Sequence, residues 1–323
     1  AAMPQEGNRM DIKKVTVAGG GVLGSQIAFQ SAYSGYDVTI WLRTEASIGR
    51  CQPKLDYLHA TYLKTLDAMK ESPAAYAYGL MPREDVTPQS CEDAKAKVEA
   101  AYANIKLTTD WDEAFGDADL VIEAVAESVE QKVAFYTELA KHLPERTIID
   151  TNSSTLLPSQ FAEATGRPEK FLALHFANEI WSHPTAEVMR HAGTGDEAFE
   201  TTIAFAASIR MIPLRVNKEQ PGYLLNSMLV PFLNSAEALW ANEVATPEDI
   251  DRAWTLGTGA PAGPFRILDI VGLTTAYNIG IMDPRAKDPS TVQGKITAKL
   301  KEKIDRGELG LNAGKGFYEY PKQ

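Results

Sequence analysis

The chain has 323 residues, of which 44% are hydrophobic, and is therefore long enough for two domains with cores of their own. Its formal net charge of −11 makes nucleic acid an unfavourable partner, because the phosphate backbone carries the same sign. No apolar run approaches the roughly 20 residues that a helix needs to cross a bilayer, so we expect no membrane partner.

Two cysteines, Cys51 and Cys91, are isolated in the sequence and lack the spacing of metal ligands. Their isolation is typical of a protein that works under reducing conditions. The sequence therefore predicts no metal site and a cytoplasmic location.

A glycine-rich turn follows the first apolar run, residues 15–18, and precedes a helical stretch at residues 26–32. Its three glycines have the G-x-G-x-x-G spacing of a dinucleotide-binding turn, in which the first permits a tight turn, the second admits a pyrophosphate and the third allows close helix packing. The start of the helix adds free N–H donors and a positive dipole end. The residues expected to hold the phosphates are Gly19, Gly21, Val22, Leu23 and Gly24.

The second expected strand, residues 38–42, ends without the carboxylate that usually accepts bonds from the ribose of NAD. Leu42 occupies the expected acid position and Arg43 follows it. An arginine can pair with a 2′-phosphate, and no carboxylate repels that phosphate here. The sequence therefore favours NADP(H), with NAD(H) as the alternative.

Apolar strand-like runs alternate with helical patterns through the first two thirds of the chain, which predicts an α/β fold with a Rossmann-type doubly wound sheet. The stretch from about 46 to 103 is too long for an ordinary crossover, and we expect it to form a helical insertion. This dinucleotide-binding domain is expected at residues 10–211. Later strands are expected at residues 105–107, 120–125, 147–150, 171–175 and 186–189.

An all-α second domain is expected at residues 212–323, after a change of composition around residues 213–221. Residues 223–240 carry apolar side chains at helical spacing over a wide face, which is typical of a buried helix. Thr246 is the expected N-cap of the next helix, with Pro247 at its first position.

A candidate acid–base pair lies where two strands are expected. His175 closes the apolar run 171–174, and Glu187 lies in the extended run 186–189. Ligands of open α/β sheets bind at the carboxyl ends of strands, and a carboxylate bonded to one ring nitrogen fixes the tautomer of a histidine and raises its basicity. Such a pair suits a reaction that moves a hydride and a proton.

Four short segments carry recognisable motifs: residues 152–154 (N-S-S), 174–178 (L-H-F-A-N), 222–226 (G-Y-L-L-N) and 314–318 (G-K-G-F-Y). Glu187 lies twelve positions after His175, and Ser154 lies twenty-one positions before it. In these motifs and spacings the chain resembles the 3-hydroxyacyl-CoA dehydrogenase family, which has G-F-x-x-N where this chain has G-Y-L-L-N. Within the family, residues 152–158 and the region of Trp181 most resemble diketoreductase-like members.

The resemblance implies a role for each matching residue. His175 would be the acid–base group, oriented by Glu187, while Ser154 and Asn226 would bond to the substrate oxygen. The residues implied near the nicotinamide side of the cofactor are Glu127, Lys132, Asn152, Ser154 and Asn178. The implied substrate is a 3-keto or (S)-3-hydroxy compound, most naturally an acyl-CoA, and the implied assembly is a homodimer formed through the second domain.

Several departures from the family pattern leave the substrate open. Glu179 and Trp181 replace prolines that usually follow the histidine segment, which would reshape the pocket for a smaller keto compound. The insertion is only modestly basic, although the phosphates of CoA attract cations. The alternatives are therefore a reductase of free diketo esters or keto acids on the same scaffold, or a catalytically silent structural relative. The cations of the insertion are Arg50, Lys54, Lys64 and Lys70.

Overall fold

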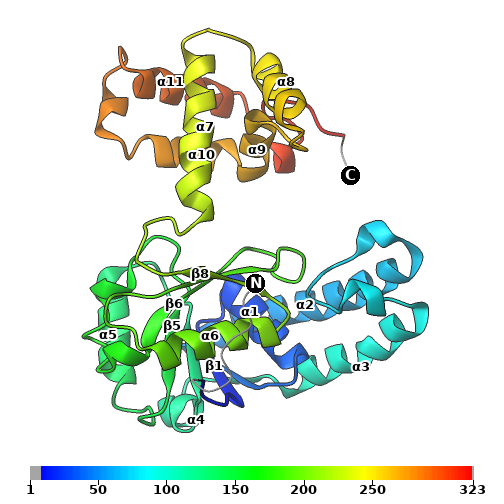
Figure 1. The fold of residues 1–323 in the computed structure, drawn as a ribbon, viewed down its shortest axis with the longest axis vertical. Helices are drawn as coiled ribbons and strands as arrows, with labels where there is room; N and C mark the ends of the chain where they lie inside the picture. The colour runs from blue at the N-terminus through cyan, green and yellow to red at the C-terminus, as the bar shows by residue number, and fades with distance from the viewer. Residues whose placement is uncertain (1–8, 322–323) are drawn as a thin grey trace. The chain divides into compact units, whose positions relative to one another are not determined.

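The structure is a computed structural model that describes residues 9–321, and it divides into two compact units. The first unit runs to Leu224 and contains the sheet, and the second begins at Leu225 and is helical (Figure 1). The expected α/β unit followed by an all-α unit is confirmed.

One eight-stranded sheet, with the order β3-β2-β1-β4-β5-β6-β7-β8, organises the first unit. Every neighbouring pair is parallel except β6 and β7, which are antiparallel. The order in which strands are added reverses between β1 and β4, because β2 and β3 lie on one side of β1 and the later strands on the other. Open sheets of this kind form a crevice for ligands at such a point. The strands are β1 (Lys14–Ala18), β2 (Asp37–Trp41), β3 (Lys106–Thr108), β4 (Leu120–Glu123), β5 (Ile148–Thr151), β6 (Phe171–Phe176), β7 (Thr185–Met189) and β8 (Ile212–Val216).

The helices of the first unit cover the sheet and form the expected insertion. Thr44 and Thr87 begin the two insertion helices, because each threonine side chain accepts a bond from the backbone three residues later. The helices are α1 (Val22–Tyr33), α2 (Glu45–Glu71), α3 (Pro88–Asn104), α4 (Trp111–Phe115), α5 (Val129–Leu139) and α6 (Asp196–Ser208). Short 3₁₀ turns are η1 (Pro73–Ala75), η2 (Arg83–Asp85), η3 (Pro158–Gln160) and η4 (Pro168–Lys170).

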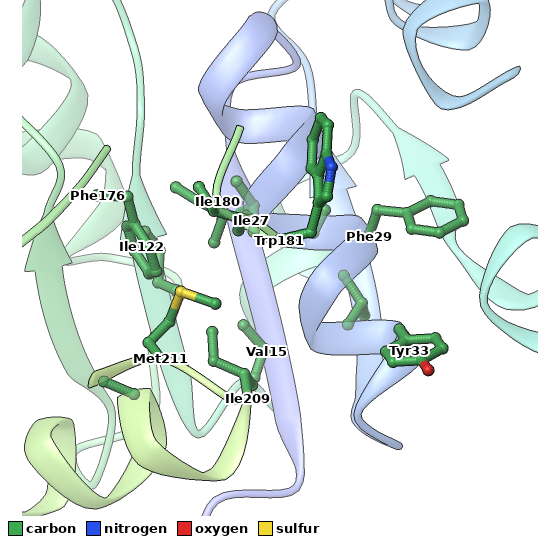
Figure 2. Close-up of a cluster of buried hydrophobic side chains, with 14 of the residues drawn as sticks. Val15, Ile27, Phe29, Tyr33, Ile122, Phe176, Ile180, Trp181, Ile209 and Met211 are labelled. Atoms are coloured by element: carbon green, nitrogen blue, oxygen red, sulfur yellow. The ribbon is translucent and has the colours of Figure 1, made fainter. Parts of the chain in front are cut away.

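Both faces of the sheet are buried, and side chains alternate between the two sides along each strand. Val17 and Ile122 belong to the core that includes α1, α2, α3 and α6. Ala18 and Val121, their neighbours in sequence, belong to the core under α4 and α5. Figure 2 shows part of the first core, with side chains of α1 packed beside those of the sheet.

Strand β8 corrects the expected domain boundary. Residues 212–216 pair with β7 in parallel, so the sheet extends past residue 211 and the first unit ends at Leu224. Pro213 suggested a break between domains, but an edge strand tolerates proline because one side of its ladder needs no N–H donor. The second unit is therefore about a dozen residues shorter than expected.

Aromatic packing and two buried aspartates, Asp251 and Asp269, hold the second unit together. Phe265 packs against Trp240 and Phe317, and Asp269 accepts bonds from the backbone of Phe317 and Tyr318. Thr246 accepts a bond from Asp249, which confirms it as an N-cap. The helices are α7 (Leu225–Ala241), α8 (Pro247–Thr258), α9 (Pro264–Val271), α10 (Leu273–Gly280) and α11 (Val292–Asp305), with η5 (Pro284–Lys287) and η6 (Leu311–Ala313).

Across residues 9–321, no helix combines the length and the apolar character needed to cross a bilayer.

Candidate active site

The glycine turn between β1 and α1 has the close contacts that its sequence predicts. Gly19 adopts φ +113°, and a Cβ there would lie 2.4 Å from the carbonyl oxygen of Ala124. A Cβ on Gly24 would lie 2.1 Å from the carbonyl oxygen of Gly19. Both positions need glycine, because the obstructing atoms belong to the backbone and cannot turn aside.

Gly21 differs from the other two glycines, since a Cβ on it would meet no atom within 4 Å. It is the N-cap of α1 and provides no side-chain bond to the first turn of that helix. It lines a cavity of about 810 Å³ together with Gly19, Leu42, Arg43 and Glu127. A glycine facing open space beside uncapped N–H donors fits the phosphates of a dinucleotide.

The end of β2 presents no carboxylate that could bind a ribose. Leu42 is buried, and its N–H donates to the carbonyl oxygen of Thr108. Arg43 is exposed at the cavity, and Ser47 of the first turn of α2 lines the same cavity. A cation and a helix start therefore stand where NAD-binding proteins usually present an acid.

The pairing of β6 with β7 brings His175 and Glu187 together. The two residues are direct partners in the antiparallel register, so their side chains lie on one face of the sheet. Nδ1 of His175 lies 3.1 Å from Oε1 of Glu187, and the side chains are 15% and 8% exposed. The carboxylate can thus fix the orientation of the ring, with Nε2 on the opposite side, toward Ser154.

Ser154 completes a triad on the other side of the imidazole. It follows β5, and its Oγ lies 3.2 Å from Nε2 of His175. The neighbouring hydroxyls of Ser153 and Thr155 both donate to Oε2 of Glu127, over 2.9 and 3.0 Å. Glu127 therefore holds the loop that presents Ser154 and also lines the cofactor cavity.

Lys132 lies beneath that cavity, fully buried, rather than on a solvated helix face. Its Nζ lies 2.6 Å from Oε2 of Glu123 and 3.3 Å from Oε1 of Glu127. Burial raises the pKa of Glu127, but the bonds from Ser153 and Thr155 and the charge of Lys132 outweigh it and lower that pKa overall. Lys132 thus contributes to the cofactor side through Glu127.

Glu123, at the end of β4, is fully buried and fully engaged. Besides Lys132, it accepts bonds from Thr151 at 2.8 Å, from the N–H of Val125 at 2.9 Å and from the hydroxyl of Tyr136. Such a set of donors makes a buried carboxylate tolerable. The sequence analysis did not assign Glu123 to the site, although an acid that closes an apolar strand was the available signal.

The two asparagines expected near the nicotinamide are held by the protein itself. Oδ1 of Asn152 accepts from the N–H of Phe176, and Oδ1 of Asn178 accepts from Nε2 of Gln26 over 2.9 Å. Oε1 of Gln26 in turn accepts from the N–H of Glu179. Gln26 of α1 therefore fixes the turn after β6, and no motif in the sequence pointed to it.

Trp181 and Glu179, which replace the prolines, behave differently from each other. Trp181 is buried in the first core (Figure 2). Its ring contacts Tyr62 of α2, and its carbonyl oxygen accepts a backbone bond from Gly79. Trp181 therefore connects the turn after β6 to the insertion and fills space in the core. Glu179 is exposed with φ +57°.

Tyr223 is the neighbour of the triad that sequence reasoning did not assign to the site. Its ring is stacked on that of His175, with centroids 4.5 Å apart and 13° between the planes. Asn226 lies in the first turn of α7, in the second unit, and its part in the reaction stays a prediction.

Two family models match the chain along almost its whole length. The model of the 3-hydroxyacyl-CoA dehydrogenase NAD-binding domain matches residues 14–220, and that of the C-terminal domain matches residues 222–320. The chain belongs to the 3-hydroxyacyl-CoA dehydrogenase family. It is thus a dehydrogenase that uses a nicotinamide cofactor, as the sequence predicted.

Relatives within this family are similar over most of their length. The mitochondrial hydroxyacyl-coenzyme A dehydrogenase of Rattus norvegicus is 31% identical, covering 96% of this chain and 91% of that protein. A 3-hydroxybutyryl-CoA dehydrogenase of Clostridioides difficile is 29% identical, covering 96% of this chain and 100% of that protein.

Solved structures show the same fold. A diketoreductase, described as acting on dicarbonyl compounds, has a TM-score of 0.82 at 44% identity, with 96% of this chain and 100% of that chain covered. The (S)-3-hydroxybutyryl-CoA dehydrogenase of Ralstonia eutropha has a TM-score of 0.73 at 28% identity, with 97% and 100% covered.

The buried charges at the cofactor side predict a large stability effect. Replacing Lys132 with methionine leaves Glu123 buried with fewer partners, and we expect the free energy of unfolding to fall by about 3 kcal/mol. Urea denaturation measures this loss. The control is Lys141→Met, an exposed lysine paired with Glu138, for which we expect a change below about 0.5 kcal/mol. Equal losses in the two variants would contradict the assigned role of Lys132.

Proposed function

We propose that this chain interconverts 3-keto and (S)-3-hydroxy compounds by transferring a hydride to or from NADP(H), with His175 as the acid–base group. The observation that carries the proposal is the imidazole held between Glu187 on one side and Ser154 on the other. This arrangement gives one ring nitrogen an orienting carboxylate and leaves the other beside a hydroxyl.

In the direction of reduction, Nε2 of His175 donates a proton to the oxygen of the carbonyl group. A nicotinamide cofactor, held by the glycine turn and Arg43, would supply the hydride to the carbonyl carbon. Glu187 stabilises the protonated ring before transfer and keeps its orientation after it, as a carboxylate does for the histidine of a catalytic triad. Ser154 would hydrogen-bond the reacting oxygen, and the family resemblance implies the same role for Asn226 and a place near the nicotinamide for Asn178.

The preference for NADP(H) rests on the end of β2. Arg43 lines the cavity, and its guanidinium makes no ion pair within residues 9–321. Because Leu42 stands at the expected acid position, no carboxylate there accepts a hydrogen bond from the ribose or repels a 2′-phosphate. Ser47, in the first turn of α2, adds a hydroxyl at the same place. NAD(H) remains the alternative cofactor.

An acyl-CoA thioester is the substrate that the family relatives support. These relatives include 3-hydroxyacyl-CoA and 3-hydroxybutyryl-CoA dehydrogenases. A 3-keto acyl-CoA carries the carbonyl that the His175 triad would protonate.

A free dicarbonyl compound is the second candidate, and the ion pairs of the insertion favour it. Lys70 and Lys95 are both engaged by Asp67 and Glu92, so four charges on α2 and α3 compensate one another. This pairing leaves fewer cations for the phosphates of CoA. The diketoreductase at 44% identity points in the same direction.

The proposed assembly is a homodimer formed through the second unit, in the cytoplasm. The exposed apolar side chains of α7, Met228 and Val230 among them, suit a covered face. Cys51 and Cys91 are both free and buried, which suits a reducing compartment.

The role of His175 is tested by His175→Asn, assayed with NADPH on acetoacetyl-CoA and on ethyl acetoacetate. We expect kcat to fall by about 10² to 10⁴ on whichever substrate the wild type reduces, because the proton donor is lost. Cofactor affinity, measured by NADPH fluorescence, is expected to stay within about twofold.

His59→Asn is the control, since His59 lies on the insertion and pairs with Glu99. It should keep the activity of the wild type on the small ester. Near-normal kcat in His175→Asn would contradict the proposal, and NADPH binding without turnover of either substrate by the wild type would favour the silent structural relative.

The cofactor assignment is tested by Arg43→Ala. We expect the kcat/KM for NADPH to fall about 10- to 100-fold, the effect of losing a hydrogen bond to a charged group. NADH serves as the internal control and should change by less than about threefold. An equal loss with both cofactors, or no loss with NADPH, would show that Arg43 does not bind the 2′-phosphate.

A further inference from the structure

We infer that Tyr223 is a positioning residue that holds all three members of the His175 triad in register. The inference rests on the proposed function. Tyr223 and its neighbour Leu224 contact His175, Glu187 and the Ser154 loop at three separate points, and each contact restrains a different degree of freedom.

The first contact is the stack of the Tyr223 ring on the imidazole of His175. The planes differ by 13° and the centroids lie 4.5 Å apart, and Tyr223 is 2% exposed. The bonds to Glu187 and Ser154 fix the ring of His175 within its own plane. The stack blocks movement out of that plane, which the two bonds alone leave possible.

The second contact anchors the loop that carries Ser154. The hydroxyl of Tyr223 donates to the carbonyl oxygen of Ser153 over 2.6 Å. Burial, reinforced by the charge of Glu187, raises the pKa of Tyr223, so the phenol stays protonated and remains a donor. The side chain that stacks on His175 therefore also fixes the backbone immediately before Ser154.

The third contact reaches the carboxylate. The N–H of Leu224 donates to Oε2 of Glu187 over 2.8 Å, while Oε1 of the same group faces His175. This bond fixes the rotation of the carboxylate about its own axis. Each carboxylate oxygen of Glu187 therefore has a partner: Oε2 the backbone N–H after Tyr223, and Oε1 the imidazole.

The backbone at this point is in a conformation that a bulky residue rarely adopts. Tyr223 has φ +53° and Gly222 before it has φ +83°. A tyrosine in the left-handed region is held there by its surroundings, and such positions cluster at functional sites. The turn closes through a bond from the N–H of Tyr223 to the carbonyl oxygen of Gln220.

The hydroxyl is the part of this arrangement that the chain adds to the motif it resembles, because G-Y-L-L-N stands where the family has G-F-x-x-N. A phenylalanine keeps the stack and lacks the bond to Ser153. Tyr223→Phe therefore removes the loop anchor alone, whereas Tyr223→Leu removes both the anchor and the stack.

The test compares Tyr223→Phe with Tyr33→Phe. The hydroxyl of Tyr33, at the end of α1, makes the same kind of bond over 2.7 Å to the carbonyl oxygen of Leu80 in the insertion, and both residues are buried. Both variants lose one buried hydrogen bond, so we expect a similar fall of about 2–4 °C in Tm.

Only Tyr223→Phe should change the chemistry. We expect its kcat to fall about 5- to 20-fold with KM for the keto substrate within about twofold, and the primary isotope effect from 4-deuterated NADPH to rise. Tyr223→Leu should lose at least another factor of about 10. A kcat for Tyr223→Phe equal to that of Tyr33→Phe would overturn the inference.

A measurement without turnover separates this inference from the proposed function. In ¹⁵N-histidine spectra, with the signals of His175 identified by their loss in His175→Asn, we expect one fixed tautomer in the wild type and broadened or averaged signals in Tyr223→Leu. Unchanged signals would overturn the inference even if the enzyme is active. Altered signals in a protein that reduces no keto substrate would support the inference and contradict the proposed function.

Discussion

The antiparallel pairing of β6 with β7 is the constraint on which the proposed chemistry of this protein depends. In a sheet whose other neighbouring strands are parallel, this one reversal sets residue 175 directly opposite residue 187. Cross-strand partners share a face and lie close enough for their side chains to bond. The histidine and its carboxylate are thus positioned by the ladder of the sheet rather than by a flexible loop.

The remaining groups of the site are connected to this pair through a series of polar contacts that begins in the core. Glu123 holds Lys132, Lys132 faces Glu127, and Glu127 accepts the hydroxyls on both sides of Ser154. These links join the cofactor cavity to the imidazole: Glu123, Lys132 and Ser153 are buried, whereas Glu127, Ser154 and Thr155 are exposed. Because each buried charge has its partners, the arrangement can be rigid at a low desolvation cost.

Much of this site could be predicted from the sequence, because its motifs depend on local geometry. The glycine turn needs no side chains, so spacing alone reveals Gly19 and Gly24, and the distance from His175 to Glu187 reflects one fixed strand pairing. The fold class followed from the alternation of strands and helices. The NADP(H) preference rests on Leu42 and Arg43 and stays a prediction.

Other features could not be predicted, because they depend on which distant segments pack together. Lys132 has the pattern of a surface helix residue, and only the meeting of α5 with β4 buries it against Glu123. Pro213 suggested a domain break although it lies in an edge strand. The stack of Tyr223 on His175 joins segments almost fifty residues apart, and no local pattern encodes it.

The most direct test of the account is the rate of hydride transfer in a single turnover by Glu187→Gln, with saturating NADPH and the better of the two keto substrates. Glutamine keeps the size of the side chain but cannot stabilise a protonated His175. We predict that the step slows by at least about 100-fold while NADPH affinity is unchanged. A hydride-transfer rate within a few fold of the wild type would show that the His175–Glu187 pair does not carry the reaction.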